Sequence, residues 1–167
     1  MAEGTARYAR ESGTWFLKLG GDLRHPLAPA LNALLDRAFA DPAFEQMAID
    51  LSAAENIDST CLGILARIGN QAHDRDGPRP VIICNNSDIN ELLLAVCFDR
   101  LFNLVSDAGP VGEQLEPLPA AEADRRAMLE LVLEAHRRLC KIDQRNNAVF
   151  CDVVRTLEDE ARQGSRS

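Results

Sequence analysis

The chain has 167 residues, of which 46% are apolar and 5% aromatic. This length accommodates one domain of ordinary size with an appendage, and its core must be built mainly from aliphatic side chains. The formal net charge of −8 repels phosphate backbones and anionic lipid, so neither a nucleic acid nor a membrane is an expected partner. The first residues lack the features of a signal peptide, and no apolar run approaches the ~18 residues of a membrane span, so we expect a cytoplasmic protein.

Strands and helices alternate along the first two thirds of the chain. Apolar runs bounded by turn signals predict the strands, which are residues 5–12, 14–20, 47–51, 81–84 and 101–105. Apolar residues at helical spacing predict the helices, which begin at His25-Pro26, at Asp58-Ser59-Thr60 and at Ser87. We expect Ser87 to be the N-cap of the third helix, and Ser59 is able to cap the second. This order predicts an α/β fold with a mixed, mainly parallel sheet of four to five strands covered by helices.

The composition changes beyond residue 107. Residues 108–120 are rich in proline and glycine, which predicts a linker. Residues 121–162 contain neither and are predicted to form a helical extension, followed by a disordered tail at 163–167. Within the extension, apolar residues at alternating spacings of three and four form a heptad seam with Asn146 at an a position, where a buried Asn fixes the register of two-stranded coils.

The seam has two interpretations, and the sequence leaves both open. In the first, the extension forms a homodimer through the residues Leu139, Ile142, Asn146, Val149 and Val153. In the second, it is a hairpin broken near Asp143 to Asn147 and packed on its own domain, which the additional apolar residues Phe150 and Leu157 favour.

The cysteines and histidines show no spacing typical of a metal site or a catalytic centre. No two of the five cysteines form a Cys-x-x-Cys motif, and each stands among apolar neighbours, where a thiol acts as a small hydrophobe. His25, His73 and His136 share no short motif with a cysteine or a carboxylate pair, so we expect each of them on the surface. No glycine-rich phosphate loop follows a predicted strand. The sequence therefore predicts no catalytic residue, no metal, no cofactor and no enzymatic activity.

One motif stands out in the middle of the chain. Ile49-Asp50-Leu51 ends a predicted strand, and Asp58-Ser59-Thr60-Cys61-Leu62-Gly63 opens a helix after a short loop. This arrangement resembles the STAS family (sulphate transporter and anti-sigma factor antagonist), in which such a strand leads to Asp-Ser-Ser/Thr-Gly-Leu-Gly. Cys61 stands where the family usually has glycine. Gly21-Asp22-Leu23 and the closing Leu101-Phe102-Asn103-Leu104 also fit, so the resemblance places a STAS domain at residues 1–107.

The resemblance implies an anti-sigma factor antagonist that regulates transcription by partner switching. In such proteins the unphosphorylated domain binds an anti-sigma factor that is also a serine kinase, and this binding liberates the sigma factor. The kinase phosphorylates the domain and so dissociates it, and a metal-dependent serine phosphatase restores it. By this analogy the phosphoacceptor is Ser59, with Thr60 as the alternative, and the partner surface comprises Asp22, Asp58, Ser59, Thr60 and Leu62.

Elementary chemistry allows two roles for Ser59. A capping hydroxyl would contribute ~1 kcal/mol to stability. A phosphate would bring about −1.5 to −2 charges, which a helix N-terminus stabilises but a partner packed over the site must desolvate. The resemblance also leaves open a STAS subunit of a signalling scaffold or of a lipid-transporting ABC complex, which would act by binding without phosphorylation.

Overall fold

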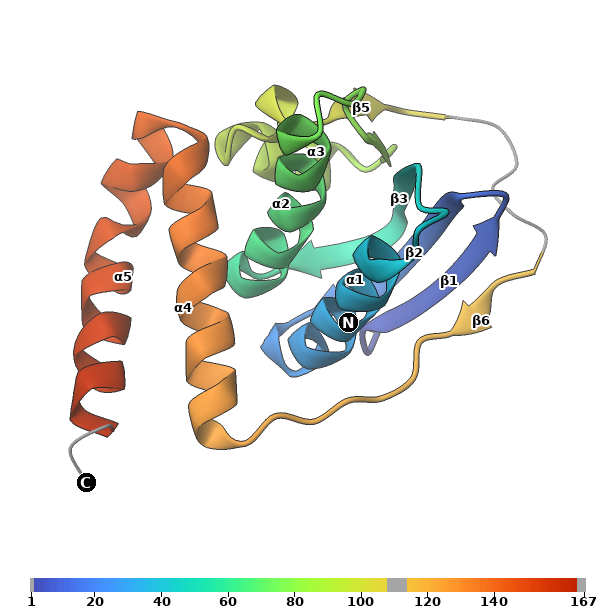
Figure 1. Cartoon of the computed structure of the whole chain (residues 1–167). Coiled ribbons are helices and arrows are strands. Elements are labelled where there is room, and N and C mark those ends of the chain that lie inside the picture. The colour runs from blue at the N-terminus through green and yellow to red at the C-terminus, as the bar shows by residue number, and fades with distance from the viewer. Residues whose placement is uncertain (1, 108–113, 165–167) are drawn as a thin grey trace.

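The computed structural model describes residues 2–107 and 114–164 (Figure 1). Its centre is a six-stranded sheet in the order β5-β4-β3-β2-β1-β6. The strands are β1 (Thr5–Glu11), β2 (Thr14–Leu23), β3 (Gln46–Ile57), β4 (Val81–Ile83), β5 (Asn103–Val105) and β6 (Glu116–Pro117). β2 to β5 run parallel to one another, whereas β1 pairs antiparallel with both β2 and β6. The predicted α/β fold with a mixed sheet is confirmed, with one short strand more than expected.

Three helices connect the parallel strands and cover one face of the sheet. They are α1 (Ala28–Ala40), α2 (Ser59–Asp74) and α3 (Ser87–Ala95), and 3₁₀ turns lie at His25–Leu27 and Phe98–Arg100. Each crossover leads to the next strand in the same direction, so its usual right-handedness places all three helices on the same side. Burial along β3 agrees, because Ile49 and Leu51 are buried while Asp50 between them is partly exposed.

The C-terminal extension is a helical hairpin that forms a further layer on α2. Figure 1 shows α4 (Arg125–Ile142) beside α2, with α5 (Gln144–Gly164) on the far side of α4. Asp143 separates the two helices with an extended backbone (φ −159°, ψ 154°). Its carboxylate accepts a hydrogen bond from the backbone N–H of Arg145 at 2.8 Å and pairs with Arg100 of the domain at 3.1 Å. Of the two arrangements that the sequence leaves open, the structure contains the hairpin.

The residues of the predicted heptad seam are divided between the interior and the surface. Leu139 and Asn146 are buried within the chain and Ile142 partly so, whereas Val149 and Val153 are 67% and 41% exposed. The Asn146 side chain donates a hydrogen bond to the carbonyl of Val96, the C-cap of α3, at 2.8 Å. Asn146 thus holds the hairpin to its own domain, and a continuous five-residue seam is not available. Self-association stays a prediction, for which Val149 and Val153 are the accessible residues of the seam.

The two strands that lead to the motif are longer than predicted. β2 continues past the expected turn at Gly20-Gly21 to Leu23, because Gly21 adopts a φ of 74° that residues with a side chain rarely tolerate. β3 continues through the expected loop to Ile57 and pairs in parallel with this part of β2. The two strands therefore end side by side immediately before α2.

Part of the predicted linker at 108–120 belongs to the sheet. Within it, β6 pairs with Arg7 and Tyr8 of β1 and so ties the chain to the sheet edge before α4 begins. Residues 108–113 lie outside the described residues. The linker is therefore anchored between the domain and the hairpin.

The hairpin also extends into the predicted tail at 163–167. α5 continues as far as Gly164, and residues 165–167 lie outside the described residues. In the described part of the chain, every helix is too short or too polar to cross a membrane.

The buried side of the hairpin predicts a difference between two apolar truncations. We expect Leu139→Ala to lower the free energy of unfolding by about 2–5 kcal/mol, because it leaves a cavity in a fully buried site. Val149→Ala, on the exposed side of α5, should change it by less than about 0.5 kcal/mol. Urea unfolding followed by circular dichroism measures both, and equal losses would contradict the docked hairpin.

Candidate functional site at the start of helix α2

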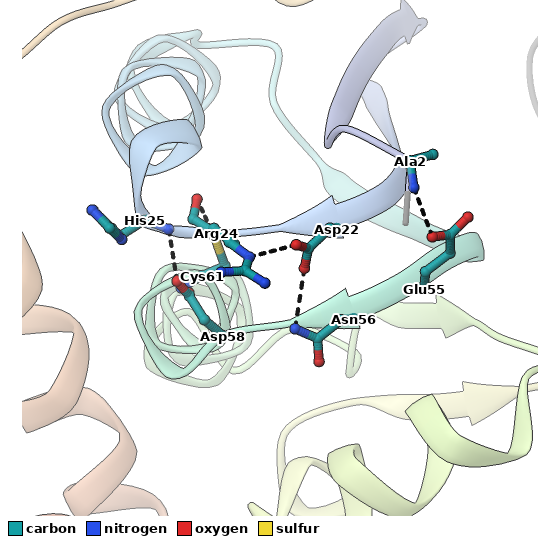
Figure 2. Close-up of polar contacts among 8 residues, drawn as sticks. All are labelled: Ala2, Asp22, Arg24, His25, Glu55, Asn56, Asp58 and Cys61. Atoms are coloured by element: carbon teal, nitrogen blue, oxygen red, sulfur yellow. Dashed lines mark hydrogen bonds and ion pairs between the residues drawn. The ribbon is translucent and has the colours of Figure 1, made fainter.

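The predicted motif lies at the carboxyl edge of the parallel strands. Asp22 is near the end of β2, and Asp58 follows the last residue of β3 directly (Figure 2). The backbone N–H of Asp58 donates a hydrogen bond to the carbonyl of Leu23 at 2.9 Å, which continues the strand pairing by one residue. This pairing places the two acidic residues and the start of α2 at one edge.

Asp58 is the N-cap of α2. Its Oδ1 accepts a hydrogen bond from the backbone N–H of Cys61 at 2.9 Å, and its Oδ2 accepts one from the backbone N–H of His25 at 2.7 Å. Figure 2 shows this carboxylate between the start of α2 and the turn that precedes α1. Ser59 is therefore the first helical residue, and the prediction that it is able to cap the helix is wrong, because the residue before it has taken that position.

Helix α3 begins in the same manner. Asn86 is its N-cap, with a side-chain oxygen that accepts hydrogen bonds from the backbone N–H groups of Asp88 at 2.9 Å and Ile89 at 3.4 Å. Ser87, predicted as the cap, is instead the exposed first residue of the helix. Ser87 and Ser59 therefore occupy equivalent positions in two helices.

The Ser59 hydroxyl bonds to His136 of α4. Ser59 Oγ lies 2.8 Å from His136 Nε2, and His136 Nδ1 lies 2.7 Å from the carbonyl of Val132. A carbonyl can only accept, so Nδ1 carries a proton, and in the neutral ring Nε2 accepts from the Ser59 hydroxyl. His136 is only 4% exposed. The prediction that His136 lies on the surface is wrong, because the docked hairpin places it over the start of α2.

Gly63 allows α4 to approach α2 one turn beyond Ser59. A Cβ atom built at Gly63 would lie 2.2 Å from the carbonyl oxygen of Ala135, far inside van der Waals contact. Ala135 and Leu139 of α4 belong to the same buried apolar cluster as Leu62 of α2. The glycine of the motif is thus a site of close helix packing in this chain.

The predicted partner-binding residues differ in their access to solvent. Asp22, Asp58 and Ser59 are partly exposed and lie at one edge. Thr60 and Leu62 are 6% and 2% exposed, so they do not form part of the accessible surface in this arrangement. Thr60, the alternative phosphoacceptor, is the less accessible of the two hydroxyl residues.

Asp22 belongs to a polar network between β2 and β3, shown in Figure 2. Its carboxylate accepts a hydrogen bond from the Asn56 side chain at 3.1 Å and forms an ion pair with Arg24. The Asn56 hydrogen bond lowers the pKa of Asp22 below its usual value; partial desolvation opposes this effect and Arg24 adds to it. At the same edge, the backbone N–H of Ala2 donates to the Glu55 carboxylate at 3.0 Å.

Cys61 points into the domain. Its side chain is fully buried, and the thiol donates to the carbonyl of Arg24 at 3.3 Å (Figure 2). Burial, helped by the nearby Asp58 carboxylate, raises the pKa of this thiol well above its usual range. Cys61 is therefore a neutral core residue, and it adds no side chain to the surface beside Ser59.

Sequence reasoning missed the part that α4 plays in this site. The signal was present, because Val132, His136 and Leu139 recur at spacings of four and three along one side of a predicted helix. A histidine inside such an apolar stripe is buried when the stripe is. The sequence could not show that the stripe packs on α2, so His136 was interpreted as a surface residue.

The capping geometry predicts which residue stabilises α2. Asp58→Ala should lower the free energy of unfolding by about 0.5–2 kcal/mol, because the start of α2 loses its side-chain acceptor. Ser87→Ala is the control, since Ser87 does not cap α3, and should change it by less than about 0.5 kcal/mol. Chemical denaturation compares the two, and an equal cost for both would argue against the assignment of the caps.

The polar network predicts the acid titration of Asp22. In Asn56→Ala the pKa of Asp22 should rise towards its usual value, because the main cause of its lowering is removed. A folded-state pKa below the unfolded one means that ionised Asp22 stabilises the fold above the unfolded pKa, and that this is lost as the pH falls through the folded pKa. Carbon-13 NMR titration measures the shift. Asn103→Ala on β5 should leave it unchanged, and the same pKa in Asn56→Ala as in the wild type would refute the assignment.

Comparison with known proteins agrees with this geometry. The family profile described as "Mlab, STAS domain" matches residues 6–79. The comparison with curated proteins gives no match. The crystal structure of an anti-sigma factor antagonist from Mycobacterium paratuberculosis is similar in fold, with a TM-score of 0.54 and 23% sequence identity over 63% of this chain and 87% of that one. Residues 6–79 therefore match the STAS domain family in sequence, and the α4–α5 hairpin lies beyond the segment that the family profile matches.

Proposed function

We propose that this chain is an anti-sigma factor antagonist whose partner surface includes Asp22, Asp58 and Ser59 and whose binding is switched by phosphorylation of Ser59. The observation that carries the proposal is the division of roles at the start of α2. Asp58 caps the helix, so helix stability does not explain a serine at position 59. The similarity in fold to a solved antagonist supports the same kind of function.

In the proposed cycle the chain is a cytoplasmic substrate and holds no catalytic residue. The unphosphorylated domain binds an anti-sigma factor that is also a serine kinase. The kinase joins Ser59 Oγ to the γ-phosphorus of ATP, the bond from that phosphorus to the β-phosphate oxygen breaks, and ADP leaves. The hydroxyl proton passes to a base of the kinase. A serine phosphatase hydrolyses the phosphoester and returns the chain to its binding state.

The charges at this edge give the phosphate its effect on binding. Asp22 and Asp58 already place two carboxylates near Ser59 on the partly exposed side of the edge. A phosphate adds about −1.5 to −2 charges at pH 7, which a packed partner would have to desolvate beside those carboxylates. The same charge lies at the positive end of α2, where the domain itself tolerates it. Phosphorylation should therefore release the partner and leave the α/β domain folded.

One observation favours a second candidate. The Ser59 hydroxyl is bonded to a buried histidine, so its proton is already engaged within the chain, which suits a domain that acts by binding alone. A STAS subunit of a signalling scaffold or of a lipid-transporting ABC complex is of this type, and dimerisation through Val149 and Val153 of α5 would suit a scaffold. The two candidates differ in whether Ser59 carries phosphate.

The proposal predicts opposite behaviour for two substitutions of Ser59. A fraction of the wild-type protein from the native host should carry a phosphate that Ser59→Ala lacks, as measured by intact mass. Ser59→Ala should capture an anti-sigma factor with a kinase domain, whereas Ser59→Asp should capture at least tenfold less. Ser87→Ala and Ser87→Asp are matched controls, because Ser87 is likewise the first residue of a helix and is exposed, and they should behave as the wild type.

The same measurement separates the second candidate. The phosphorylation switch would be contradicted if the wild type, Ser59→Ala and Ser59→Asp all lack phosphate and all capture the same partner equally. Capture of an ATP-binding transporter subunit by every variant would assign the chain to a transport complex.

A further inference from the structure

We propose that the α4–α5 hairpin is a built-in cover of Ser59, which must leave α2 before Ser59 is phosphorylated, and that phosphate on Ser59 then holds the hairpin open. This inference rests on the proposed function, because it describes how access to the phosphorylation site is regulated. Four features of the hairpin and its contact with α2 carry it.

The first feature is the position of His136 at the nucleophilic atom. Its Nε2 lies 2.8 Å from Ser59 Oγ, and its ring is buried and packs edge-on against Phe150 of α5 at 5.9 Å between centroids. Phosphoryl transfer needs the donor phosphorus within roughly 3–3.5 Å of the attacking oxygen and in line with the leaving group. A kinase must also bind the backbone around the acceptor. With α4 in place, one approach to Ser59 Oγ is occupied by the imidazole.

The second feature is the tight packing of α4 on α2, which leaves no space for additional atoms at Gly63. At Gly63, one turn from Ser59, the carbonyl of Ala135 already stands where a Cβ atom would be. A phosphoryl group on Ser59 is far larger than a methyl group and replaces the proton that the hydroxyl gives to Nε2. The phosphorylated side chain therefore has no hydroxyl proton to donate to Nε2 and gains bulk at an interface that is already in contact.

The third feature is that the hairpin is a separable unit. α4 and α5 are joined to each other by the ion pair of Arg137 with Glu158 at 3.2 Å. Towards the domain, the far end of the hairpin is held by the Asn146 hydrogen bond to the Val96 carbonyl and by the ion pair of Asp143 with Arg100. Both helices follow β6, the last strand, so they can move away without breaking a strand pairing.

The fourth feature is an unfavourable pair of cations under the hairpin. Burial lowers the pKa of the Arg138 guanidinium on α4, and the neighbouring Arg67 guanidinium on α2 lowers it further, against partial compensation by Glu134 and Asp36. Arg67 is already paired with Asp36 at 2.6 Å. Docking of α4 thus leaves the Arg138 guanidinium partly desolvated and on the same side as the Arg67 guanidinium, which already has Asp36 as its partner.

Linkage connects the two halves of the proposal. If closure of the hairpin disfavours phosphorylation of Ser59, phosphorylation disfavours closure by the same factor. Partner binding to the part of α2 on which α4 packs would act in the same direction, because it too requires α4 to move. The hairpin would then compete with the partner and the kinase for one surface.

Gly63→Ala in the full chain is the direct test, read by backbone hydrogen exchange and mass spectrometry. Alanine favours the helix α2 itself, so the substitution acts specifically against the approach of α4. We expect the amides of Arg125–Ile142 to exchange at least tenfold faster, while those of β2 and β3 keep their protection. Gly77→Ala is the matched control, since a Cβ there meets an atom only at 3.4 Å, and it should exchange as the wild type. Ser59→Asp should open the hairpin in the same way.

Phosphate on Ser59, measured by intact mass after expression in the native host, completes the test. The proposal expects at least threefold higher occupancy in Gly63→Ala than in the wild type or Gly77→Ala. Unchanged exchange of α4 in both Gly63→Ala and Ser59→Asp would overturn it, as would slower exchange in Ser59→Asp, which would mean that His136 pairs with the anion and locks the hairpin. Faster exchange with unchanged occupancy would overturn the cover but leave the proposed function standing. The lack of phosphate in every protein would instead refute the proposed function.

Discussion

The close approach of α4 to α2 at Gly63 is the contact on which the state of the candidate site depends. Because Gly63 has no side chain, the backbone of Ala135 packs directly on α2, and this depth brings His136 within hydrogen-bonding distance of Ser59. A larger residue at position 63 would hold the histidine away from the hydroxyl. Gly63, which belongs to the motif that indicates the family, thus has a further role in this chain: it is the position on α2 against which α4 packs.

Around this contact, the start of α2 divides its tasks among neighbouring residues. Asp58 satisfies the helix terminus and ties it to the turn before α1, and Cys61 fills the core beneath it. The Ser59 hydroxyl has its hydrogen-bond partner, His136, in the hairpin and not in the domain that carries the motif. Asp58 therefore stabilises the helix terminus, while the adjacent Ser59 is available for modification. A change in the chemical state of Ser59 leaves the cap of α2 in place.

Local patterns in the sequence predicted the elements of the sheet and its three covering helices, because each has its own apolar periodicity and turn signals. They failed where a distant segment decides the outcome. Ala53 and Ala54 have little strand propensity, yet β3 includes them because β2 pairs alongside. The break near Asp143 was one of the two arrangements that the sequence allowed, but its ion pair with Arg100 of the domain belongs to the docked arrangement, which a local pattern does not specify. The site was located through its motif, but its covering by His136 depends on the packing of α4 on α2, which no local pattern specifies.

The hydrogen bond between Ser59 and His136 joins the hairpin to the candidate site, and the imidazole nitrogens report on this bond. A long-range nitrogen-15 NMR spectrum of the full chain distinguishes the three histidines, of which His25 and His73 are exposed. We expect His136, alone of the three, to hold its proton fixed on Nδ1, with an Nε2 resonance that shifts in Ser59→Ala while those of His25 and His73 do not. A His136 ring that exchanges between tautomers as the exposed rings do, and that ignores Ser59→Ala, would contradict it.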